Sequence, residues 1–122
     1  MKKALVIDDI REMADGICQM LSLMDIQAVA AYNPISALMK VKEHVPDVVF
    51  VDIHMPGIDG VEVIAYLRRE PAFMDVPMVV VTSDDQKETR DLALKAGAMD
   101  VIIKPVTFEV LERVVKSIKS YS

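Results

Sequence analysis

Short apolar runs alternate along this chain with segments in which apolar residues recur at helical spacing. Five runs, rich in Val and Ile, cover residues 4–7, 28–31, 48–51, 78–81 and 101–103. Each run is continuously apolar, which is typical of strands that are buried on both faces of a sheet. Between the runs, apolar residues lie three or four positions apart, as in Ala14, Ile17 and Leu21. This spacing predicts amphipathic helices that alternate with the strands.

The residues between these elements support the same division of the chain. Asn33-Pro34 places a capping side chain before a proline at the first helical position, and Thr107 or Ser83 is a candidate cap for the helix that follows it. Gly97 is expected to end a helix in the left-handed conformation. Five strand–helix units in series predict an α/β domain with a parallel sheet and helices on both faces.

Length and composition exclude several classes of protein. A chain of 122 residues has room for one hydrophobic core, so we expect a single domain over residues 1–122. The apolar fraction of 52% excludes intrinsic disorder, and the one cysteine, Cys18, excludes a disulfide scaffold. No apolar run approaches the roughly 20 residues that a membrane helix needs, and Met1-Lys2-Lys3 leads into a strand rather than a signal peptide. A cytoplasmic protein without membrane contact is therefore expected.

The charge balance argues against a nucleic-acid-binding surface. The chain has 14 basic and 19 acidic residues and a net charge of −5. Binding to DNA or RNA needs a basic surface that neutralises phosphates. We therefore expect no direct nucleic-acid binding by this domain.

Polar residues directly follow four of the predicted strands. Asp8-Asp9 follows the first strand, Asp52 the third, Thr82-Ser83 the fourth and Lys104-Pro105 the fifth. Open α/β sheets bind their ligands at the carboxyl ends of the strands. We therefore expect these side chains to gather at one edge of the sheet, although they are far apart in the sequence.

Each of these residues alone has a purely structural explanation, such as a helix cap, a turn or a solvated charge. Together they require more, because two carboxylates about 5 Å apart repel by about 3 kcal/mol at an effective dielectric constant of 20. A divalent cation with oxygen ligands would offset this repulsion, and Lys104 adds a fixed positive charge. This combination suits phosphoryl transfer, in which a carboxylate attacks phosphorus while cations neutralise the phosphoryl oxygens.

The sequence resembles the receiver domains of two-component response regulators. The matching motifs are Asp8-Asp9, residues 51–60 (VDIHMPGIDG), Thr82-Ser83, residues 93–98 (ALKAGA) and Lys104-Pro105. They occur in the family's order and spacing, and the resemblance extends from residue 3 to about residue 119. It implies a flavodoxin-like (βα)5 fold with strand order 2-1-3-4-5 and a place in a two-component or phosphorelay system.

The resemblance also implies roles for individual residues. Asp52 corresponds to the aspartate that accepts a phosphoryl group from a phosphohistidine of a sensor histidine kinase or a histidine phosphotransfer protein. Thr82 corresponds to the hydroxyl that moves to bind the phosphoryl group, and Lys104 to the lysine that pairs with it. The Lys104-Pro105 peptide bond is usually cis in this family.

A Mg²⁺ site is implied in the same way. Asp9 corresponds to a direct ligand of the ion, and Asp8 to a residue that holds it largely through water. Asp52 and the backbone carbonyl of His54 would complete the protein ligands. We expect the domain to catalyse only its own phosphorylation and dephosphorylation, so an enzyme with a separate substrate is not expected.

Some positions depart from the family pattern or have no role in it. Val101 stands where receivers commonly carry a Tyr or Phe that turns inward, and a stiff β-branched residue has no ring to rotate. We therefore expect phosphorylation to move the helix after the fourth strand and to affect the fifth strand little. The His54 side chain is expected at the mouth of the site, where it would orient water, block it or be solvated. His44 is expected to be exposed, and Cys18 to be a buried thiol rather than a reactive one.

Three other classes of function fit the sequence less well. A haloacid-dehalogenase-like phosphohydrolase needs a second acid two residues after its nucleophile, where this chain has Ile10 or His54. A docking module that is never phosphorylated usually lacks one of the acids or the lysine, and none is missing here. A nucleotide- or flavin-binding protein would need a Gly-rich loop after the first strand, where this chain has two aspartates.

The sequence leaves the output of the domain open. The signal passes either to a downstream protein or to a fused output domain, and a homodimer is compatible with both. The predicted docking face combines the helix after the fourth strand with the last helix. Leu94, Val110 and Val114 are its expected exposed apolar contacts.

Overall fold

The computed structural model describes residues 3–43, 45–55 and 60–118. Its strands are β1 (Lys3–Ile7), β2 (Gln27–Ala31), β3 (Val48–Asp52), β4 (Met78–Thr82) and β5 (Asp100–Ile103). The helices are α1 (Arg11–Ser22), α2 (Pro34–Glu43), α3 (Gly60–Arg68), α4 (Lys87–Ala96) and α5 (Phe108–Lys116), with a short 3-10 helix, η1 (Pro71–Phe73). All five predicted strands are confirmed, because each apolar run coincides with a strand to within one residue at either end.

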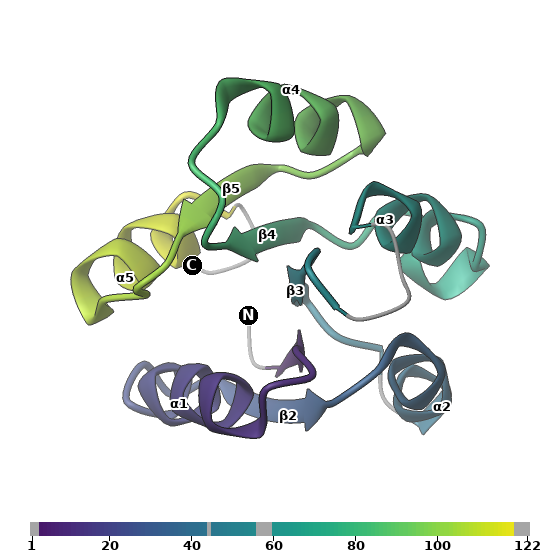
Figure 1. Cartoon of the computed structure of the whole chain (residues 1–122). Helices are drawn as coiled ribbons and strands as arrows, with labels where there is room; N and C mark the ends of the chain where they lie inside the picture. The colour runs from purple at the N-terminus through teal and green to yellow at the C-terminus, as the bar shows by residue number, and fades with distance from the viewer. Residues whose placement is uncertain (1–2, 44, 56–59, 119–122) are drawn as a thin grey trace.

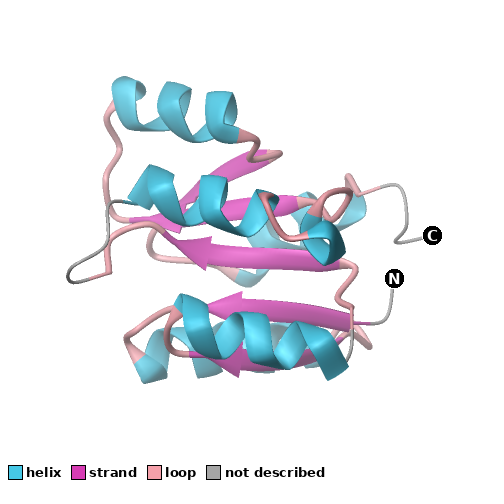
Figure 2. Cartoon of the chain, turned by 90° about the vertical axis from the view of Figure 1, so that its right-hand side faces the viewer, coloured by secondary structure: helices cyan, strands magenta, loops and turns pink. Residues whose placement is uncertain are grey.

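The strands form one parallel sheet in the order β2-β1-β3-β4-β5, which confirms the expected flavodoxin-like fold. Helices α1 and α5 cover one face of the sheet, and α2, α3 and α4 contribute to the core on the other face (Figure 1). All strands run in the same direction (Figure 2). The loops that follow the strands therefore meet at one edge of the sheet, which we call the carboxyl edge; the opposite edge is the amino edge.

Alternate residues of the strands enter opposite cores. Leu5 and Ile7 of β1 belong to the core shared with α2 and α3, whereas Ala4 and Val6 belong to the core shared with α1 and α5. Strands β3 and β4 are buried at every position. Because both faces of these central strands are covered, they are apolar without alternation, and polar residues gather where the strands end.

Local sequence explains three of the helix ends. Asn33 accepts a hydrogen bond from the backbone N–H of Ser36 (2.8 Å), and Thr107 accepts one from Val110 (3.3 Å), as their capping chemistry predicts. Gly97 ends α4 with a φ of 118°, in the left-handed region. The prediction of Ser83 as a helix cap is wrong, because α4 begins only at Lys87 and the intervening loop is organised by other side chains.

Three further features bear on the sequence predictions. The Lys104-Pro105 peptide bond is cis, as the family resemblance implied. Cys18 is half-buried against the core of α1 and α5, and desolvation raises the pKa of its thiol to about 11, so the thiolate is scarce at neutral pH. Within residues 3–43, 45–55 and 60–118, no helix combines the length and apolar character needed to cross a membrane.

Candidate phosphoryl-transfer site

Three carboxylates meet at the carboxyl edge of the sheet. Asp8 and Asp9 directly follow β1, and Asp52 is the last residue of β3. The parallel register pairs Ile7 with Val51, so the residues that follow this pair along the two strands are also neighbours. One oxygen atom from each of the three carboxylates lies within 4.8 Å of the other two. The fold therefore brings together three acids from two separate segments of the chain.

Burial leaves two of the three acids poorly solvated. Asp8 and Asp52 are 1% and 3% exposed. Desolvation by burial raises the pKa of Asp8, and the charge of Asp52 raises it further, against the lowering effects of a hydrogen bond from the Ile10 N–H (2.9 Å) and of Lys104. The Oδ1 atom of Asp9 is buried and has no hydrogen-bond partner among the described residues.

Lys104 directly follows β5, two strands away from β3, and supplies positive charge to the cluster. Its Nζ atom lies 3.3 Å from Oδ2 of Asp8 and 3.3 Å from Oδ2 of Asp52. The backbone N–H of Lys104 donates to the carbonyl of Thr82 (2.7 Å), which holds the residue against the end of β4. One ammonium thus faces two of the three acids, and the four groups carry a net charge of −2 when all are ionised.

The donor set fits a divalent hard cation. Carboxylate oxygens are the protein ligands that Mg²⁺ prefers, and the acidic cluster offers one from each of its three residues. The unpaired Oδ1 atom of Asp9 is a buried acceptor that a cation would satisfy. A doubly charged ion would also balance the excess negative charge. Asp8, Asp9 and Asp52 are therefore the residues that could hold Mg²⁺, whereas the His54 carbonyl stays a prediction from the sequence.

Thr82 is the last residue of β4, which is paired with the strand that carries Asp52. Strands β3 and β4 are paired so that Asp52 is opposite Val81, the residue before Thr82. The Thr82 side chain is completely buried. Its Oγ1 atom accepts a hydrogen bond from the backbone N–H of Asp84 (3.1 Å). The hydroxyl is thus tied to the loop that leads into α4.

His54 lies beside Asp52 with its side chain in solvent. Its backbone N–H donates to Oδ1 of Asp52 (2.9 Å), and the side chain is 52% exposed. The imidazole Nε2 atom is 3.8 Å from Oδ2 of Asp84. At this distance the two groups are neighbours without a direct hydrogen bond.

Asp84 is a residue of this region that the sequence predictions missed. It contacts the His54 side chain and, through its backbone N–H, Thr82. A signal was present, since an aspartate in the polar stretch before a helix is typical of a turn in which its side chain bonds the backbone two residues further on. That signal predicts a loop conformation and not the contacts with His54 and Thr82.

The remaining predicted residues lie in different surroundings. Val101 is buried in the same core as Ala93 and Ala98. On the predicted docking face Leu94 is 37% exposed and Val110 is half-buried. The prediction that Val114 is exposed is wrong, because it points from α5 into the core shared with α1 and is 3% exposed. His44 lies outside the described residues.

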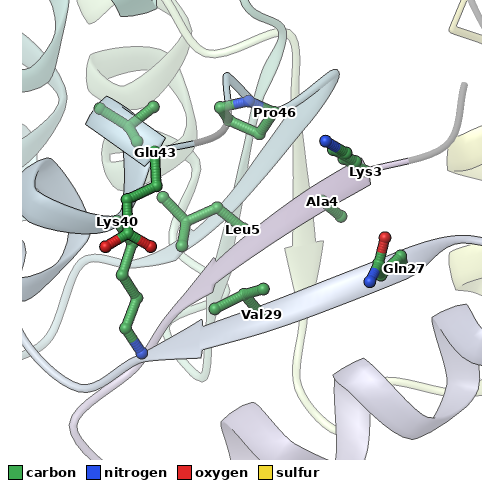
Figure 3. Close-up of a pocket in the computed structure, with 9 residues that line it drawn as sticks. Lys3, Ala4, Leu5, Gln27, Val29, Lys40, Glu43 and Pro46 are labelled. Carbon is green, nitrogen blue, oxygen red and sulfur yellow. The ribbon is translucent and has the colours of Figure 1, made fainter.

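A cavity of about 350 Å³ lies apart from the acidic cluster, along β1, β2 and the second half of α2 (Figure 3). Lys3, Leu5, Gln27, Val29 and Lys40 are among its lining residues. The ammonium of Lys40 donates to the carbonyl of Ala30 in β2, which is an edge strand. Lys40 belongs to α2, and this contact satisfies one backbone carbonyl of the edge strand within the fold, so the lysine has a structural role here.

Comparison with known proteins agrees with this geometry. The family described as "Response regulator receiver domain" matches residues 4–116. The phosphate regulon transcriptional regulatory protein PhoB of Escherichia coli is 31% identical over 117 residues, which make up 96% of this chain and 51% of that protein. The chain thus spans about half the length of the curated relatives it matches.

Solved structures share the fold over nearly the whole chain. A two-component response regulator from Clostridium difficile superposes with a TM-score of 0.89 at 27% identity, with all of both chains covered. The receiver domain of NtrX from Brucella abortus has a TM-score of 0.87 at 27% identity over 98% of this chain and 99% of its own. The Vibrio cholerae chemotaxis protein CheY4, at 23% identity and a TM-score of 0.89, supports the fold alone; 97% of this chain and 98% of that one are covered.

Proposed function

This chain belongs to the family of response regulator receiver domains, and from that premise we propose that Asp52 accepts a phosphoryl group in a Mg²⁺-dependent reaction. The acceptor is expected to take the group from a phosphohistidine of a partner protein. The observation that carries the proposal is the convergence of Asp8, Asp9 and Asp52 with Lys104 at the end of the sheet. They come from the carboxyl ends of three different strands, β1, β3 and β5, and their charges complement a phosphoryl group together with a divalent ion.

The proposed step is an in-line displacement at phosphorus. A carboxylate oxygen of Asp52 forms a bond to phosphorus, and the phosphorus–nitrogen bond of the phosphohistidine breaks. The bonding electron pair stays on the imidazole nitrogen, which takes a proton from solvent. The product is an acyl phosphate on Asp52, and its later hydrolysis by water returns the carboxylate.

Residues of the chain itself orient and neutralise the reacting groups. The His54 N–H holds one oxygen of Asp52 in place, which leaves the carboxylate a defined orientation. Lys104 faces the other oxygen and is positioned to pair with the phosphoryl oxygens after transfer. Asp8, Asp9 and Asp52 would hold Mg²⁺, which when bound supplies positive charge opposite the charge that develops on the phosphoryl group.

The proposed setting of this chemistry is a two-component or phosphorelay pathway. The donor would be a sensor histidine kinase or a histidine phosphotransfer protein, and the target either a separate protein or a further domain. We infer that residues 1–122 form a single receiver domain without nucleic-acid binding of its own, since the net charge is −5. A cytoplasmic location and a homodimer are compatible with this function.

The test compares the wild type with Asp52→Asn, using a small-molecule phosphodonor and Mg²⁺ and reading the intact mass. We expect the wild type to gain one phosphoryl group and the variant to gain none, because the amide is a poor nucleophile. Asp91→Asn, a change of the same kind at an exposed position of α4, is the matched control and should label like the wild type. Labelling of Asp52→Asn at the wild-type level would refute the assignment. Release of phosphate from the donor over many turnovers without a labelled protein would favour a phosphohydrolase instead.

A further inference from the structure

Asp84 links the acceptor loop, the buried threonine and the start of α4. It lies between β4 and α4, and four contacts to four other residues converge on it. Asp85, its neighbour in the sequence, is exposed. The two adjacent acids therefore have the same charge and very different surroundings.

The carboxylate of Asp84 organises the start of α4. Its Oδ1 atom accepts a hydrogen bond from the backbone N–H of Gln86 (2.9 Å), and its Oδ2 atom accepts one from the hydroxyl of Thr89 (2.6 Å). Gln86, the residue before the helix, makes no capping bond with its own side chain. The bond from Thr89, followed by that from Gln86 and by the nearby His54, lowers the pKa of Asp84. Asp84 thus acts as an ionised anchor for this end of the helix.

The backbone of Asp84 holds the hydroxyl of Thr82. The Asp84 N–H donates to Thr82 Oγ1 (3.1 Å) inside a completely buried environment. Movement of this oxygen toward a phosphoryl group on Asp52 must break the bond or take the loop with it. Since the loop is anchored to α4 by the Asp84 carboxylate, the position of the threonine is coupled to the start of the helix.

The Asp84 side chain also reaches across to the loop after β3. Its Oδ2 atom is 3.8 Å from Nε2 of His54, whose backbone N–H is bonded to Asp52. Asp84 therefore contacts the segments that carry both the acceptor and the threonine.

We propose that Asp84 is a positioning residue that holds Thr82 and the amino end of α4 in the resting arrangement. Phosphorylation of Asp52 then has to overcome the contacts of Asp84 before the loop and the helix can move. The inference rests on the proposed function, because it assigns a cost to the switch that phosphorylation drives. It predicts that weakening Asp84 makes the phosphorylated arrangement easier to reach.

The experiment measures binding of beryllium fluoride, a stable phosphoryl mimic, in the presence of Mg²⁺ by calorimetry. We expect Asp84→Ala to bind the mimic at least about fivefold more tightly than the wild type, as for a typical coupling between sites. Asp84→Asn keeps an acceptor for the Gln86 N–H and should restore most of the wild-type affinity. Asp85→Asn removes the same charge one residue away and should leave the affinity unchanged.

Amide hydrogen exchange without Mg²⁺ or mimic gives a second readout that does not depend on phosphoryl chemistry. Exchange at residues 86–90 should be faster in Asp84→Ala than in Asp85→Asn, with residues 93–98 unchanged. Affinity of Asp84→Ala within twofold of the wild type, or an equal gain in Asp85→Asn, would overturn the proposal. If the wild type binds no mimic, the proposed function fails. Faster exchange in Asp84→Ala would then show that Asp84 is only a structural anchor, and the proposed coupling would be refuted. Should Asp84→Ala not fold, Asp84→Asn decides, since it must then show a smaller gain of the same sign.

Discussion

The two ends of α4 are held by different kinds of contact, and they lie at opposite edges of the sheet. At the carboxyl edge, the start of the helix is held by Asp84, beside a buried hydroxyl and close to an acidic cluster with excess negative charge. At the amino edge, the end of the helix is held by Arg68 of α3. Its guanidinium donates to the carbonyl of Gly97 (2.9 Å) and to the carbonyls of Phe73, Met74 and Val76 (2.6–3.1 Å).

Under the proposed function, the contacts at the carboxyl edge respond to phosphorylation, whereas those at the amino edge do not. The carbonyls around Arg68 are satisfied within the fold, and a phosphoryl group on Asp52 offers nothing that competes for them. The contacts at the other end involve a hydroxyl, a carboxylate and an imidazole, all of which interact with added charge. We therefore expect α4 to pivot about its end at Gly97 when its start is released.

The largest change in the free energy of unfolding is expected from removing the Arg68 contacts at the amino edge. Arg68→Met removes a charged donor from four backbone carbonyls and should lower the free energy of unfolding by about 2–3 kcal/mol. Arg68→Lys, which keeps the charge but not the fork of donors, should lower it by less. Urea unfolding at neutral pH measures both. A loss below about 0.5 kcal/mol in Arg68→Met would show that water replaces the arginine and that the end of α4 is not fixed by it.

A smaller loss of unfolding free energy is expected from substituting Gly97, at the same end of α4. Gly97 has a φ of 118°, and an added Cβ would lie 3.2 Å from Nε of Arg68. Gly97→Ala should therefore cost about 1–2 kcal/mol, from backbone strain and displacement of the arginine. Gly16→Ala is the matched control, because nothing lies within 4 Å of its Cβ position in α1. That change should raise stability by up to about 1 kcal/mol, since alanine is the better helix former. Equal effects of the two substitutions would contradict the role of the left-handed turn.

At the carboxyl edge we expect a substitution to raise, and not to lower, the free energy of unfolding. Asp8 is buried and its pKa is raised, so the protonated form stabilises the fold below the pKa of the unfolded chain, and this contribution is lost as pH rises through the folded-state pKa. Asp8→Asn should therefore raise the free energy of unfolding at neutral pH without Mg²⁺ by about 1 kcal/mol, and its advantage should shrink as pH falls through the raised folded-state pKa of Asp8 toward the ordinary pKa of the unfolded chain. Added Mg²⁺ should stabilise the wild type more than the variant. Thermal unfolding over a pH series tests this, and a destabilised Asp8→Asn protein at neutral pH would show that the Lys104 contact outweighs the burial.

Strand positions followed directly from the order of residues. Coverage of both faces requires continuous apolar runs, and these runs predicted every strand to within one residue. Helix caps at Asn33 and Thr107 were also predictable, because each depends on residues only three positions apart. Ser83 failed as a cap, since the loop after β4 continues for three further residues and Asp84 takes the available N–H of Gln86. Val114 failed because periodicity predicts an apolar stripe, whereas the packing of α5 beside α1 determines which edge of it is covered.

The identity of the residues at the strand ends is a property of the chain alone, because hydrophobic periodicity and turn chemistry act over a few neighbouring positions. Periodicity predicts that Asp8, Asp9, Asp52 and Lys104 lie at one edge of the sheet. Which of these groups form ion pairs with one another depends on distances between segments far apart in the sequence. Only the folded arrangement puts Lys104 between Asp8 and Asp52, leaves one oxygen of Asp9 unpaired and joins Asp84 to His54. Burial and Coulomb energies depend on those distances, so the electrostatics of the site come from the packing of the sheet and not from any local stretch of sequence.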